Sequence, residues 1–106
     1  MSRCVIVSYA PKPGKDADLL IAVEKHLRVL KAENLITDRP GYVMRSRDGY
    51  IIEVFEWRSA EAIEQAHSNA AVGKLWAEFE KACRYVPLSD IDECRNLFAE
   101  FEPVEF

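Results

Sequence analysis

Apolar residues along the chain follow two spacings, one typical of strands and one of helices. Residues 3–9 read RCVIVSY, rich in β-branched side chains and followed by two prolines, so they are predicted to form a first strand. From Asp16 to about Glu33, apolar residues recur every three or four positions, which predicts an amphipathic helix. His26 falls near the charged side of this helix, and we expect it to be exposed to solvent.

The next part of the sequence predicts a β-hairpin. Residues 42–47 and 50–57 are rich in the apolar and aromatic side chains of strands. Between them lies Asp48-Gly49, a dipeptide that supplies the positive φ angles of a tight two-residue turn. We therefore expect two antiparallel strands joined by this turn.

A broken helix and a last strand follow. Ser59 is a suitable N-cap for a helix that ends near His67, and Ser-Asn after it can interrupt the helix. A second helical stripe then covers residues 70–84. Pro87 ends the helical region, and the aromatic-rich residues 97–106 are predicted to form the fourth strand.

The order strand, helix, strand, strand, helix, strand defines the fold class. It is the α+β, ferredoxin-like βαββαβ arrangement, in which an antiparallel sheet carries its helices on one face. A chain of 106 residues is long enough for one core and too short for two. We therefore expect a single domain spanning residues 1–106.

Both faces of the predicted third strand are apolar, although helices cover only one face of such a sheet. Ile52 and Val54 point to one side, and Ile51, Phe55 and Trp57 point to the other. Each such side chain contributes roughly 1.5–3 kcal/mol when it is buried. A second copy packed sheet to sheet would bury the open face, so we expect a two-fold homodimer.

Composition and charge argue against several classes of function. The formal net charge is −4 and basic residues are scattered among acids, so neither nucleic acid nor a membrane surface is an expected partner. The three cysteines lack CxxC spacing, which indicates reduced thiols in a cytoplasmic protein. Two histidines and three cysteines occur without the spacing of metal ligands, so no metal site is predicted.

His67 and Glu56 are the candidate catalytic residues. An imidazole titrates near neutrality and can remove a proton from a phenol, although a structural or surface histidine is the alternative. Glu56 lies in a strand that is otherwise apolar, where it is either a pocket acid or base or a cross-strand ion pair with Arg45 or Arg47. The same two interpretations apply to Glu53, which has the weaker claim to the pocket.

Five further residues are candidates for substrate binding. The aromatic ones can form the walls of a pocket for an aromatic ligand, or they can simply be core residues at strand and helix spacing. The candidates are Ser8, Met44, Trp76, Phe79 and Phe101.

Two motifs carry a resemblance to a known family. A Pro-x-Pro-Gly motif at residues 11–14 precedes the first helix, and VFEWRSAEAIEQAH covers Val54 to His67. The Glu-Trp pair, the Ser-capped helix and the histidine at its end resemble the antibiotic-biosynthesis-monooxygenase-like family of dimeric α+β barrels. The resemblance implies a homodimer with a pocket between sheet and helices in each subunit.

The resemblance also implies a range of activities. Some members oxidise small aromatic, phenolic or quinol compounds with molecular oxygen and no cofactor, and His67 would then be the base. The haem-degrading branch uses an Asn on the first strand and a His after the helical Trp. Residues 3–9 contain no Asn and His67 precedes Trp76, so haem degradation is disfavoured. A non-catalytic ligand-binding or stress-associated domain, or an isomerase or lyase, are the alternatives.

Overall fold

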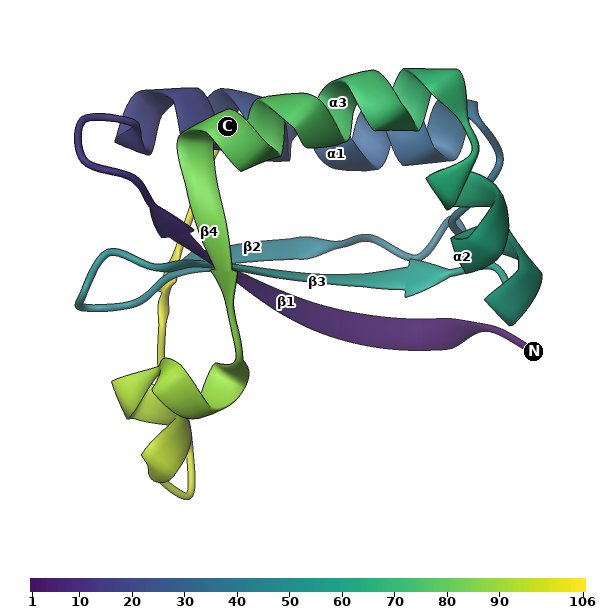
Figure 1. The fold of residues 1–106 in the computed structure, drawn as a ribbon. Coiled ribbons are helices and arrows are strands. Elements are labelled where there is room, and N and C mark those ends of the chain that lie inside the picture. The colour runs from purple at the N-terminus through teal and green to yellow at the C-terminus, as the bar shows by residue number, and fades with distance from the viewer.

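The computed structural model describes residues 1–106. Figure 1 shows two long helices side by side over one face of an antiparallel sheet, with strand order β4-β1-β3-β2-β5. The predicted α+β ferredoxin-like arrangement is confirmed. The elements are β1 (Arg3–Pro11), α1 (Asp16–Ala32), β2 (Tyr42–Arg45), β3 (Ile51–Trp57), α2 (Ala60–His67), α3 (Ala70–Ala82), β4 (Cys83–Val86), the 3-10 turns η1 (Leu88–Asp90) and η2 (Asp92–Arg95), and β5 (Glu102–Pro103).

The predicted break between two helices is present, and each helix has its own cap. The Ser59 hydroxyl accepts a hydrogen bond from the Ala62 N–H at 3.1 Å and starts α2. The Asn69 side chain accepts one from the Val72 N–H at 3.0 Å and starts α3. Each cap satisfies a backbone donor that has no partner within its helix, so the chain can change direction at this point.

The hairpin turn is wider than the predicted two-residue turn. Of the dipeptide Asp48-Gly49, only Gly49 has a positive φ, at 89°. The Ser46 N–H donates to the Tyr50 carbonyl at 2.9 Å, and the Ser46 hydroxyl accepts from the Tyr50 N–H at 3.0 Å. The loop between Ser46 and Tyr50 therefore has three residues and ends in a glycine, which is the next most common type of hairpin loop. The hydrogen bond to the Ser46 side chain stabilises this wider loop.

The prediction for the fourth strand was wrong. The structural fourth strand is β4, which pairs with β1, whereas residues 97–106 contain only the two-residue β5 against the β2 edge. Helix α3 ends at Ala82 and the chain becomes extended at Cys83, with φ of −153° and ψ of 172°. No turn residue marks this change. The helical spacing therefore continued, in the prediction, into residues that in fact form a strand before Pro87.

The two faces of the sheet have different surroundings. Helices α1 and α3 cover the inner face, and Figure 1 shows the segment after β4 on the opposite, outer side. Ile52 and Ile91 are fully buried on that side, so this segment covers part of the outer face. Ile6 and Tyr42 on the same face remain 53% and 68% exposed. The homodimer that would bury them stays a prediction.

Candidate functional site

A cavity of about 470 Å³ lies between the sheet and the helices. This volume is within the usual range of small-molecule sites. Its walls are mostly apolar and come from both layers: Val5, Val7 and Tyr9 on β1, Phe55 and Trp57 on β3, His26 on α1, His67 on α2, Trp76, Phe79 and Glu80 on α3, and Tyr85 on β4. The predicted residues His67, Trp76 and Phe79 are therefore brought together in one cavity.

His67 stands at the lip of the cavity. It is the last residue of α2 and is exposed, with its ring centroid 5.2 Å from that of Trp76 in an edge-on contact. Its Nδ1 lies 2.9 Å from the Ile63 carbonyl oxygen, which can only accept, so Nδ1 carries a proton. In the neutral ring Nε2 then has a free lone pair and can accept a proton from a ligand.

His26 is buried, which overturns the prediction that it is exposed. Only 4% of its surface is accessible, and Nδ1 lies 2.8 Å from Glu53 Oε1. The spacing contains a signal for this position, because Val23, His26 and Leu30 form one helical stripe and all three are buried. The ring packs edge-on against Phe55 and Phe79, at centroid distances of 5.4 and 5.0 Å.

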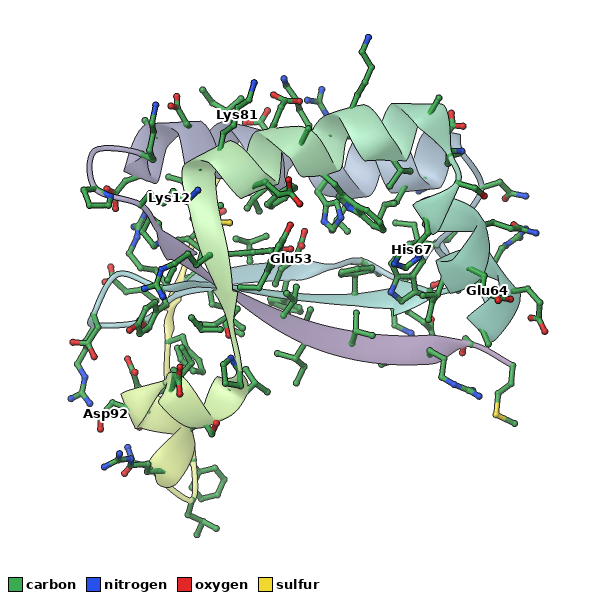
Figure 2. All side chains as sticks on the ribbon, in the orientation of Figure 1. Lys12, Glu53, Glu64, His67, Lys81 and Asp92 are labelled. Carbon is green, nitrogen blue, oxygen red and sulfur yellow. The ribbon has the colours of Figure 1, made fainter.

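Glu53 is the centre of a buried hydrogen-bond network. Figure 2 shows it between the helices and the sheet, and it is fully inaccessible to solvent. Oε1 accepts from the Tyr9 hydroxyl at 2.6 Å as well as from His26, while Oε2 has no hydrogen-bond partner. Burial, and then the neighbouring Glu53 carboxylate, raise the pKa of Tyr9, so its hydroxyl stays protonated and donates.

Trp76 connects this network to the lip of the cavity. Its indole N–H donates to His26 Nε2 at 3.3 Å, and its ring contacts His67. An indole N–H can only donate, so His26 Nε2 is an acceptor and the proton of its neutral ring is on Nδ1, facing Glu53. Trp76 therefore lies between the two imidazoles of the cavity.

Glu56 does not share the cavity with His67. It pairs with Cys4 in the register of β1 and β3, so it faces the outer side of the sheet. Hydrogen bonds from Ser2 and Thr37, each at 2.8 Å, and from Arg39 at 3.0 Å lower the pKa of Glu56 to about 2. Its ion-pair partner is Arg39 from the preceding loop, and neither Arg45 nor Arg47 bonds to it.

Three predicted substrate-binding residues lie outside the cavity. Ser8 is buried on the outer face and donates to the Val86 carbonyl at 2.5 Å. Met44 is on the same face, opposite Ile52 in the strand register. Phe101 lines a separate, polar depression near the C-terminal segment. Strand position alone did not predict which side of the sheet holds the cavity.

The charges around the cavity limit what it can bind. No Lys or Arg lines it, and its only acidic lining residue is Glu80. Elsewhere in the chain, too, no group of three or more His, Cys, Asp or Glu side chains is arranged to hold a metal ion. No helix is both long and apolar enough to cross a bilayer.

Two solved structures share this fold, although no protein-family model matches the sequence and no curated protein is similar to it. The first is SnoaB, a cofactor-independent oxygenase from Streptomyces nogalater. It is 9% identical, with a TM-score of 0.69 over 80% of this chain and 86% of SnoaB. The second is Rv0793 from Mycobacterium tuberculosis, 17% identical, with a TM-score of 0.67 over 81% of this chain and 89% of Rv0793. The chain therefore has the α+β fold of these two structures.

Proposed function

We propose that this chain is a cofactor-independent monooxygenase that oxidises a small aromatic, phenolic or quinol substrate with molecular oxygen. The observation that carries the proposal is an apolar cavity of about 470 Å³ with a proton-accepting imidazole, His67, at its lip. An apolar site strengthens the interaction between a phenolate and the protonated base beside it, and it admits dioxygen. SnoaB, which has the same fold, is a cofactor-independent oxygenase.

The proposed reaction needs only the substrate, dioxygen and one base. The phenol O–H bond breaks and its proton moves to Nε2 of His67. The phenolate gives one electron to O2, and the resulting superoxide and phenoxyl radical combine to form a C–O bond at a ring carbon. His67 returns its proton to give a hydroperoxide. Loss of water, which takes the hydrogen of that carbon, leaves a quinone that keeps one oxygen atom.

Oxygen uptake tests this reaction directly. With a panel of phenols and quinols in an oxygen electrode, we expect enzyme-dependent uptake of one O2 for each quinone formed from a phenol. With ¹⁸O2, one labelled atom should enter that product. Absence of uptake above the uncatalysed rate for every compound that binds would contradict the monooxygenase function.

A second candidate function is binding of an apolar ligand without chemistry. The hydrogen bond from Trp76 to His26 favours binding without chemistry, because it occupies the lone pair with which the inner imidazole would act as a base. A binding protein would be stabilised by its ligand in thermal unfolding and would consume no oxygen. The uptake experiment therefore separates the two candidates.

We also propose that two copies associate through the outer face of the sheet. The exposure of Ile6 and Tyr42 on that face supports this, because a second sheet would bury both side chains. Sedimentation velocity at micromolar concentration should show a dimer. A single species with the mass of one chain would contradict the proposal.

A further inference from the structure

We infer that the cavity between the sheet and the helices binds a ligand with a positively charged organic group, a protonated or quaternary amine. The charge lies against the aromatic walls of the cavity, and Glu80, which is exposed at its edge, is the counter-ion. The inference rests on the proposed function, because it concerns the same cavity, and it adds a cationic group to the aromatic substrate.

The lining of the cavity carries one negative charge and no permanently positive one. Neither Lys nor Arg is among the lining residues, and Glu80 is the only acid there. The nearest basic contact to Glu80 is Lys12, whose ammonium donates to the Glu80 backbone carbonyl at 2.6 Å. None of the ion pairs in the structure includes the Glu80 carboxylate, so this group is free to pair with a ligand.

A second negative charge lies behind the wall, on Glu53. Its Oε1 accepts from Tyr9 and His26, and a proton on Oε2 would be a buried donor without an acceptor, so the carboxylate is ionised. The His26 ring is neutral because its Nε2 accepts the Trp76 N–H. Buried charges are normally paired with an opposite charge. Here Glu53 has only neutral donors, and both of these donors line the cavity.

The walls are aromatic and suit a cation. The π-face of an aromatic ring is negative and attracts a cation that lies within about 6 Å of the ring centroid. Neighbouring rings are close enough to contact one ligand together, with centroids 5.0 Å apart for Tyr9 and Phe79 and 5.3 Å apart for Phe55 and Trp57. The aromatic side chains that line the cavity are Tyr9, Phe55, Trp57, Trp76, Phe79 and Tyr85.

A cationic substrate also fits the proposed chemistry. That reaction forms a phenolate and then superoxide, which adds negative charge to a cavity that already faces Glu53 and Glu80. Charges of the same sign repel strongly where water is excluded. A positive charge fixed on the substrate offsets this repulsion, whereas a carboxylate or sulfonate on the substrate would increase it.

Binding without oxygen tests the inference in the absence of turnover. We would titrate the wild-type chain anaerobically with three meta-substituted phenols that carry a trimethylammonium, a tert-butyl or a sulfonate group. These groups have similar shapes and differ in charge. The ammonium compound should bind about tenfold more tightly than its neutral isostere, as expected for cation–π contacts in an aromatic site. The sulfonate should bind most weakly.

The location of binding can be read from fluorescence. The chain has two tryptophans, and both of them, Trp57 and Trp76, line the cavity. Quenching of their emission should follow the binding isotherm from calorimetry. Equal affinity for the ammonium and tert-butyl compounds, tightest binding of the sulfonate, or binding that leaves tryptophan emission unchanged would overturn the inference.

A matched pair of variants tests the counter-ion. Glu80→Gln should weaken binding of the ammonium compound about threefold, within the usual range of a partly exposed ion pair, and leave the neutral compound unaffected. Glu78→Gln is the control, because Glu78 is an exposed acid on the same helix that lies outside the cavity. It should change neither affinity. An equal effect of the two variants would overturn the assignment of Glu80.

Oxygen uptake separates this inference from the proposed function. A preference for the ammonium compound without uptake of oxygen for any phenol would contradict the monooxygenase proposal and leave the cation site standing. Uptake with neutral phenols, together with equal binding of the charged and neutral compounds, would do the reverse.

Discussion

Replacing Glu53 with alanine should lower the free energy of unfolding by about 2–6 kcal/mol, because it leaves two buried donors unpaired and each costs about 1–3 kcal/mol. Glu53 is completely buried, and its Oε1 accepts hydrogen bonds from both Tyr9 and His26. Without it, the hydroxyl and the imidazole N–H become unpaired donors inside the core. Urea unfolding followed by circular dichroism measures the change.

The same network provides a matched control. Glu53→Gln keeps the side-chain volume and an acceptor oxygen, so it should cost clearly less than Glu53→Ala. A triple variant, Glu53→Leu with Tyr9→Phe and His26→Leu, removes donors and acceptor together and should recover much of the lost stability. The free energy of unfolding of Glu53→Ala could instead lie within about 1 kcal/mol of the wild-type value, below the usual cost of a lost buried partner. In that case Tyr9 and His26 do not need Glu53 to satisfy their hydrogen bonds.

The parts of the fold that depend on local pattern were predictable. The stripe of α1, the caps at Ser59 and Asn69, and the hairpin all follow from spacing and from residues that bond within their own segment. Strand β4 was missed because α3 passes into it at Cys83 without a turn residue. Residues 83–86 form a strand because they pair with β1, which is distant in sequence.

The candidate site was predictable only in part, for the same physical reason. His67 follows from its place at the end of a helix next to a break in the pattern. The link between His26 and Glu53 spans 27 positions along the chain and appears only when α1 packs on β3. Glu53 does share a strand face with Ile51 and Phe55, both buried, so alternation contained a signal that its charge concealed.

Glu56 illustrates the opposite error. It was a candidate acid or base because the strand around it is apolar, yet alternation places it on the outer face with Cys4. Its lowered pKa keeps it ionised at neutral pH, where it serves as the acceptor for Ser2, Thr37 and Arg39. A carboxylate with three donors holds loops to the sheet and is poorly suited to proton transfer.

Replacing His67 with alanine should reduce oxygen-dependent turnover by about 10²- to 10⁴-fold, the usual contribution of a positioned base. The substrate still enters the cavity, so the loss should appear mainly in kcat. His67 is exposed at the end of α2, and the hydrogen bond that its side chain makes is to the Ile63 carbonyl. The unfolding free energy should therefore change by less than about 1 kcal/mol, as for other surface substitutions.

Two comparisons make the His67 test specific to its imidazole. Glu64→Gln changes an exposed residue on the same helix, and Figure 2 shows its side chain on α2, so turnover should stay at the wild-type level. Because His67 is at the lip of the cavity, imidazole added to the buffer can reach the vacated position in His67→Ala. It should restore part of the turnover in proportion to its concentration, while leaving Glu64→Gln unaffected. Undiminished turnover in His67→Ala would remove His67 from the mechanism, because the other imidazole of the cavity, His26, already accepts a hydrogen bond from Trp76 and cannot replace it without a rearrangement.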